Sequence, residues 1–165
     1  MTTIKKLGAV ACGSLLALTL GACGSSPDSQ SASDQSSATA EQAAPAESGS
    51  KYAVTIDGAK VVKTYDDKDA VAVTFTFTNN SDEAEAFGTA TSVTVYQDGV
   101  EQEIAMPADN PENYGNSMSK VKPGASITVD GVYGLANTTS PVEVEVTELF
   151  DLDRTVLAEK TFNLS

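Results

Sequence analysis

Few residues of this 165-residue chain are suited to catalysis. The sequence contains no histidine, which removes the usual general base of serine and cysteine hydrolases and the commonest zinc ligand. Its only cysteines are Cys12 and Cys23, so the chain beyond Cys23 offers no thiol nucleophile and no disulfide. It also lacks a phosphate-binding glycine loop and a G-x-S-x-G sequence. We therefore expect no enzyme activity, no cofactor and no metal site.

Carboxylates leave two alternatives open. Asp151 and Asp153 form a pair that could hydrolyse glycosides without histidine, which would make the protein a carboxylate-dependent cell-wall glycosidase. They fall in an expected turn, where acidic residues are common for backbone reasons, so we favour a turn. Asp66, Asp67 and Asp69 could bind Ca²⁺, but the glycine and distal glutamate of a calcium loop are missing. A solvated turn is the preferred interpretation there too.

Cys23 is the residue with the clearest predicted chemistry. It ends the sequence Leu20-Gly-Ala-Cys23, which matches the bacterial lipobox. The thiol would carry a diacylglyceryl thioether with fatty-acyl chains such as palmitate, and cleavage before it would free its amine. We therefore predict lipid attachment at Cys23.

The residues before Cys23 fit an export signal. Lys5 and Lys6 precede an apolar run, and small residues stand at its exit, as in a secretory signal peptide spanning residues 1–22. A plain signal-peptidase site would use the same small residues, but leucine three positions before cysteine favours lipoprotein processing. A transmembrane anchor is disfavoured because the run is short. The prediction is a cell-membrane protein that is lipid-anchored on the extracytoplasmic face.

Residues 23–50 form a different kind of segment. Ser and Ala supply 15 of the 27 residues from 24 to 50, and the segment contains no Val, Ile, Leu, Met, Phe or Tyr. Such a composition cannot offset the entropy lost on ordering the chain. We predict a disordered tether that spans roughly 30 Å between the membrane and the domain at residues 51–165.

The chain is strongly acidic. Its formal net charge is −13, and removal of Lys5 and Lys6 with the signal peptide makes it −15. This sign opposes binding to nucleic acid, since affinity for phosphates comes from cationic side chains. A solvated acidic surface is the simplest interpretation, and cationic partners are the alternative.

Within residues 51–165, apolar and polar side chains alternate as they do in β-strands. Val71, Val73, Phe75 and Phe77 share one face of the clearest strand, Ala70 to Thr78, which we expect at the centre of the core. Further strands are expected at the ranges 52–65, 84–88, 91–96, 100–106, 118–121, 125–133, 142–146 and 155–164. With no convincing helix, this pattern favours an all-β antiparallel β-sandwich, and a closed barrel is the alternative. We expect the domain to be monomeric.

Several strand and turn sequences are similar to those of a known family. They are Tyr52-Ala-Val-Thr-Ile-Asp-Gly58, Val73-Thr-Phe-Thr-Phe-Thr-Asn-Asn-Ser81, Lys122-Pro-Gly-Ala125 and Ser140-Pro-Val-Glu-Val144. With the lipobox and the Ser/Ala linker, they resemble Gram-positive lipoproteins that carry a C-terminal immunoglobulin-like extracellular domain of unknown function. Secreted mycobacterial immunogenic proteins are similar. The resemblance implies an immunoglobulin-like β-sandwich at the cell surface and carries over no catalytic residue.

The long loop Pro107–Ser117 is the candidate site for a partner. Long loops in compact domains are often functional, and this one offers Asp109, Glu112 and Tyr114 for recognition. We predict a non-catalytic binding or adhesion domain whose partner is an envelope or extracellular protein. The alternative is an accessory or structural subunit of a cell-envelope complex.

Overall fold

The computed structural model describes residues 40–41 and 50–164. The predicted signal peptide 1–22, Cys23 and the tether 23–50, apart from residues 40, 41 and 50, lie outside the described residues. The described part is built almost entirely of antiparallel strands, so the all-β prediction is confirmed. None of its helices is long and apolar enough to cross a membrane.

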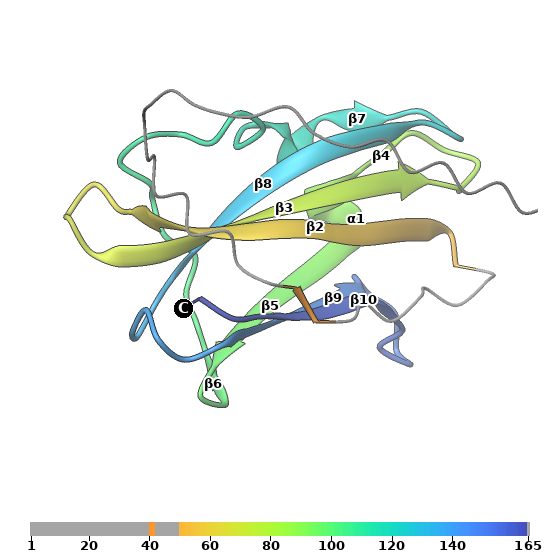
Figure 1. Cartoon of the computed structure of the whole chain (residues 1–165). Helices are drawn as coiled ribbons and strands as arrows, with labels where there is room; N and C mark the ends of the chain where they lie inside the picture. The colour runs from red at the N-terminus through yellow and green to blue at the C-terminus, as the bar shows by residue number, and fades with distance from the viewer. Residues whose placement is uncertain (1–39, 42–49, 165) are drawn as a thin grey trace, which may run out of the picture. The chain divides into compact units, whose positions relative to one another are not determined.

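One layer of the domain is a three-stranded antiparallel sheet in the order β2-β3-β8 (Figure 1). Its strands are β2 (Tyr52–Lys63), β3 (Asp69–Asn79) and β8 (Ser126–Gly134). The predicted alternation holds in β3, because Val71, Val73, Phe75 and Phe77 are fully buried. β2 is bulged between Ile56 and Gly58, at the pair Asp57-Gly58, a sequence typical of a turn or a bulge.

The other layer is a five-stranded sheet in the order β1-β10-β9-β5-β6 (Figure 1). Every neighbouring pair in it is antiparallel. Its strands are β1 (Ala40–Glu41), β10 (Val156–Phe162), β9 (Val142–Glu148), β5 (Thr91–Gln97) and β6 (Val100–Glu101).

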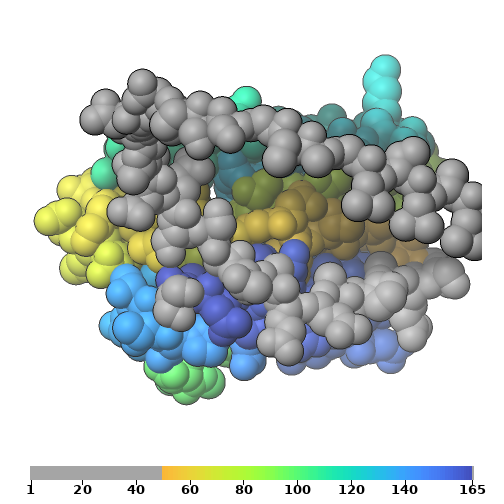
Figure 2. Space-filling model, in the orientation of Figure 1, coloured from red at the N-terminus to blue at the C-terminus, as the bar shows by residue number. Residues whose placement is uncertain are grey.

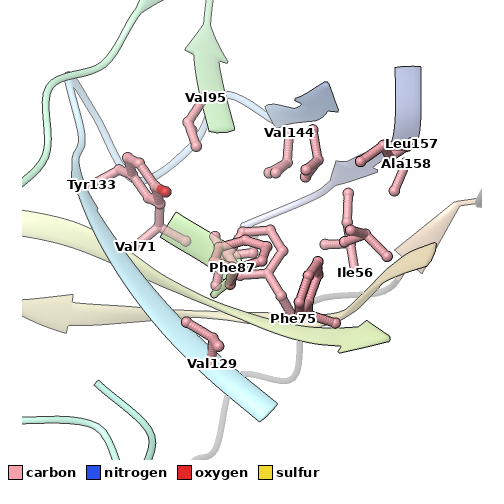
Figure 3. Close-up of a cluster of buried hydrophobic side chains, with 14 of the residues drawn as sticks. Ile56, Val71, Phe75, Phe87, Val95, Val129, Tyr133, Val144, Leu157 and Ala158 are labelled. Carbon is pink, nitrogen blue, oxygen red and sulfur yellow. The ribbon is translucent and has the colours of Figure 1, made fainter. Parts of the chain in front are cut away.

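The core lies between these two sheets, as in a β-sandwich. Phe75 from the first sheet and Val95, Val144 and Leu157 from the second belong to one buried cluster (Figure 3). The ring of Phe87 fills the space between the sheets, with its centroid 5.3 Å from that of Phe75. Burying such a face is the main force that holds the domain together, because no disulfide is available.

The expected strand at residues 84–88 is wrong in its second half. β4 is only Glu85–Ala86, and the next four residues form the single helical turn α1, Phe87–Ala90. The hydroxyl of Thr91 closes this turn by donating to the Phe87 carbonyl at 2.8 Å. The turn places Phe87 and Ala90 in the core, so burial overrides the local β pattern.

Two other expected strands are shorter than the pattern indicated. The strand expected at residues 100–106 ends at Glu101, because the chain then leaves the second sheet and meets β8 through a bridge between Ile104 and Tyr133. The strand expected at residues 118–121 is only β7, Lys120–Val121, which pairs with β4 and follows the 3₁₀ turn η1, Asn116–Met118. In both places the strand ends where the chain turns away from its partner strand, which depends on the tertiary structure and not on the local sequence.

Candidate functional site

The long loop Pro107–Ser117 packs on the outer face of the first sheet. Ala70, Ala72 and Val132 form a small buried cluster on this face, away from the main core. Tyr114 and Ala105 are half-buried against that cluster. The loop is therefore held on the sheet by apolar contacts as well as by the hydrogen bonds described next.

Asp130 is the polar residue that fixes the loop. Its side chain leaves β8 on the outer face and is only 7% exposed. One carboxylate oxygen accepts from the Thr74 hydroxyl at 2.7 Å, and the other accepts from the Asn113 backbone N–H at 2.9 Å and side-chain amide at 3.3 Å. The Asp130 N–H in turn donates to the Asn113 carbonyl at 3.2 Å. Asn113 thus lies beside the edge of β8 and is hydrogen-bonded to both the backbone and the side chain of Asp130.

A polar cleft opens beside this contact. It has a volume of about 350 Å³ and runs between β2, β3 and the loop. Its lining includes Lys60, Thr74, Glu112, Asn113 and Asp130. The carboxylate of Asp130 is already engaged by loop and strand donors. Lys60 and Glu112, which form no ion pair with another described residue, give the cleft one charge of each sign.

A larger and more apolar groove lies at the side of the sandwich where β5 and β8 face each other. Its volume is about 580 Å³. Val93, Ile104, Val129, Tyr133 and Leu149 contribute apolar lining, and Asp130 is the one charged residue among the lining positions of this groove. Tyr114 also lines it, so the long loop borders both cavities.

Tyr133 is the buried titratable group of the groove. Its ring lies between Val71 and Val95 in the core and is 7% exposed (Figure 3). A Cβ on Gly131 would lie 2.9 Å from the ring and hydroxyl of Tyr133, so only glycine leaves room for the ring there. Burial raises the pKa of Tyr133 well above its usual value of 10.0. The shift therefore extends the pH range over which Tyr133 stays a neutral phenol into the alkaline region.

The three loop residues singled out from the sequence lie in different environments. Asp109 and Glu112 are exposed, and Glu112 borders the polar cleft. Tyr114 is half-buried with its ring against the small outer cluster, so it serves first as an anchor of the loop. The structure thus leaves two of the three side chains free to meet a partner.

The acidic turn at residues 66–69 is organised by lysines. Asp66 contacts Lys68 at 2.7 Å, and Asp69 contacts Lys63 at 3.0 Å. Lys68, followed by the Thr64 hydroxyl, lowers the pKa of Asp66. The turn projects from the β2–β3 end of the domain (Figure 2). Within residues 40–41 and 50–164, no three acidic side chains are grouped to hold a metal ion.

Asp151 caps the turn between β9 and β10. Its carboxylate accepts from the Thr155 hydroxyl at 2.5 Å, the Thr155 N–H at 2.9 Å and the Asp153 N–H at 3.2 Å. These bonds, led by that of the hydroxyl, lower the pKa of Asp151. Neither Asp151 nor Asp153 lines the two cavities described above. The Asp151 carboxylate therefore holds this turn together, and the arrangement of the two residues offers no support for a glycosidase.

Sequence reasoning missed Asp130 and Tyr133, the two buried polar residues of the site. The available signal for Asp130 was its position in the middle of Ile127-Thr-Val-Asp-Gly131, since aspartate is depleted in strand interiors. Tyr133 lies in the strand expected at residues 125–133, where a strand residue with a hydrated hydroxyl is the ordinary interpretation. Only the packing of the second sheet reveals that its ring is in the core. The candidate lipid site Cys23 lies outside the described residues.

A protein family described as a domain of unknown function, DUF5067, matches residues 26–148. The chain belongs to the DUF5067 family. The matched residues include the long loop and the strands β2, β3, β5 and β8, which line the two cavities. The match ends at Glu148, the last residue of β9. No curated protein matches the chain in sequence.

One solved structure is similar to this DUF5067 protein. It is YcdA of Bacillus subtilis subsp. subtilis strain 168, described as a candidate lipoprotein, with a TM-score of 0.56 and 15% sequence identity. The alignment covers 74% of this chain but only 40% of YcdA, so the chain spans less than half the length of that neighbour. At this identity the similarity shows the fold alone.

Proposed function

We propose that this DUF5067 protein is a lipid-anchored lipoprotein on the extracytoplasmic face of the cell membrane. The proposal rests on the lipobox at Cys23 with its preceding signal sequence. The description of the structural neighbour as a candidate lipoprotein agrees with it. A Gram-positive origin and an immunoglobulin-like classification of the sandwich belong to the same proposal, supported by the sequence resemblance.

The β-sandwich is the functional part and binds a partner protein without catalysing a reaction. The observation that carries this proposal is the 580 Å³ groove, whose lining is apolar or uncharged except for Asp130. Asp130 already accepts hydrogen bonds from Thr74 and Asn113, so it is poorly placed for proton transfer. A hydrophobic concavity with a few polar groups is the common form of a binding site.

Replacing Cys23 by alanine tests the anchor. Cys23→Ala should remove label in cells grown with a fatty-acid probe and should release the protein from the membrane pellet. Cys12→Ala is the matched control, since Cys12 lies within the expected signal peptide and should leave labelling unchanged. A Cys23→Ala protein that still carries label would contradict the anchor.

A charge placed at the mouth of the groove tests the binding role. Ile104 is 81% exposed and lines the groove, whereas Val100 is 63% exposed on β6 and does not line it. Ile104→Lys should reduce partner capture from intact cells at least tenfold, and Val100→Lys should leave it within about twofold. Equal capture by both variants would contradict a role for the groove. Hydrolysis of cell-wall glycans by the purified protein would contradict the hypothesis that it is not an enzyme.

A further inference from the structure

β5 is paired along only part of its length on one of its two sides. It pairs with β9 along its whole length, from Thr91 with Glu148 to Gln97 with Val142. On the other side β6 pairs only with Tyr96 and Gln97. Among the described residues, no strand lies beside Thr91–Thr94 on that side.

The direction of the free backbone groups follows from one hydrogen bond. The Val95 carbonyl accepts from the Gln102 N–H at 2.8 Å, so it points away from β9. Backbone groups in a strand change sides at each residue, and those of Val93 therefore point the same way as those of Val95. The Val93 N–H and carbonyl thus face the open side, directly above the groove that its side chain lines.

The opposite wall of the groove is closed to such pairing. The chain that follows β6 crosses to β8 and forms two backbone hydrogen bonds with it: Gly134 N–H donates to the Glu103 carbonyl, and Ala105 N–H donates to the Val132 carbonyl. The long loop adds a third, because the Asp130 N–H donates to the Asn113 carbonyl. The connection from β6 therefore covers the edge of β8 and leaves the edge of β5 open. The free stretch of four residues would span about 13 Å at 3.3 Å per residue.

The open edge also lacks the features that protect edge strands. Natural edges usually carry charged side chains, proline or a bulge that opposes pairing with another chain. The segment Thr91-Ser-Val-Thr-Val-Tyr96 contains none of these residues and is rich in β-branched side chains. Its pairing with β9 runs without a register shift. It is a ready template for an added strand.

We infer that a short extended segment of a partner protein adds to β5 beside Thr91–Thr94 and inserts an apolar side chain into the groove toward Tyr133. Main-chain hydrogen bonds would provide the pairing and the groove the side-chain selection, as in other strand-addition complexes. This inference deepens the proposed binding function and rests on it.

Charge identifies the kind of segment that fits. Glu101 and Glu103 are exposed next to the groove residue Ile104, and the whole chain has a net charge of −13. A segment with Lys or Arg flanking its apolar residue would be complementary to this rim. The chain's own linker, residues 24–50, contains Asp and Glu but no Lys or Arg, so it is a poor occupant.

A random heptapeptide phage library, selected on the full-length chain in detergent, provides the probe. The selected peptides should share an apolar residue flanked by Lys or Arg. Calorimetry on the synthetic peptide should give an affinity at least tenfold weaker for Val93→Pro, which removes the free N–H but no bond to β9. Val93→Thr keeps the N–H, so it should weaken binding at least threefold less than Val93→Pro does.

N-methylated peptides test the pairing without changing the protein. Methylation at every second residue should weaken binding at least tenfold in one register and little in the other, because alternate N–H groups face β5. Insensitivity in both registers would overturn strand addition, as would a folded Val93→Pro variant with unchanged affinity. If binding is then still lost on Ile104→Lys, the groove remains a binding site and only strand addition fails. Selection of no peptide would overturn the inference and leave the capture experiment to test the proposed function.

Discussion

Two buried polar residues on opposite faces of β8 define the site at the scale of single residues. Asp130 faces outward and ties the long loop to the sheet, whereas Tyr133 faces inward between the sheets. Each is 7% exposed, and their environments differ in the partners available. Hydrogen-bond donors surround the Asp130 carboxylate, whereas apolar side chains surround the Tyr133 ring. This agrees with the rule that buried charges need hydrogen-bond partners.

Asp130→Ala should lower the free energy of unfolding by roughly 1–3 kcal/mol, because it leaves the Thr74 hydroxyl and the Asn113 N–H without their acceptor. Urea unfolding measures this change, and amide exchange should speed up at Asn113 and Tyr114. Asp109→Ala is the control, since an exposed side chain in the same loop should change stability by less than about 0.5 kcal/mol. Equal losses for the two variants would contradict the anchoring role of Asp130.

Tyr133→Phe should remove part of the loss of stability at alkaline pH. The folded pKa of Tyr133 lies above the unfolded value of about 10, so the stabilisation is complete below pH 10. It decreases as pH rises further, since the unfolded phenol ionises while the buried one does not. Urea unfolding at pH 7, 9, 10 and 11 checks the difference. Parallel pH profiles for the variant and the wild type would show that the burial of Tyr133 does not matter.

At the scale of elements, β3 is the centre of the sandwich. It pairs with β2 on one side and β8 on the other, and its inner face is fully buried. Its outer face carries both the small apolar cluster under the loop and Thr74, the partner of Asp130. One strand therefore supports the main core and the base of the polar cleft.

Phe75→Ala should lower the free energy of unfolding by roughly 3–5 kcal/mol, as for other fully buried aromatic side chains. The loss of packing against Phe87 and the cavity left behind both contribute. Thr76→Ala, on the outer face of the same strand, should cost less than about 1 kcal/mol, since it loses only an exposed hydrogen bond to Asp57. A Phe75→Ala protein that unfolds like the wild type would contradict the central position of β3.

At the scale of the whole molecule, residues 51–165 hold together without a disulfide. No cysteine follows Cys23, so reduction can remove no covalent constraint from residues 51–165. β1 adds only two residue pairs to the edge of β10, whereas β9 pairs with β10 along six register positions. The segment before residue 50 should therefore contribute little to stability.

A fragment of residues 51–165 should fold by itself as a monomer with β-type circular dichroism. Its melting temperature should lie within a few degrees of that of the full chain and should not change with reductant. Thermal unfolding of both proteins with and without dithiothreitol provides the comparison. Substantial helix, or a fragment that fails to fold, would contradict this independence.

The sequence alone determined the all-β class, the inner face of β3 and the positions of β5 and β9, and it indicated a bulge or a turn at Asp57-Gly58. These features follow from alternation and turn residues within one short segment, which act over a few positions. The same local pattern fails at α1 and at residues 100–106, where burial of Phe87 and the crossing between sheets decide the backbone.

Only the tertiary structure decided which residues form the candidate site. The bond between Thr74 and Asp130 joins positions 56 residues apart, and no local pattern encodes such a pairing. The sequence singled out the loop with Asp109, Glu112 and Tyr114, but packing showed that Tyr114 holds the loop down. The groove lies between β5 of one sheet and β8 of the other, so it depends on how the two sheets are arranged in space and not on any one segment.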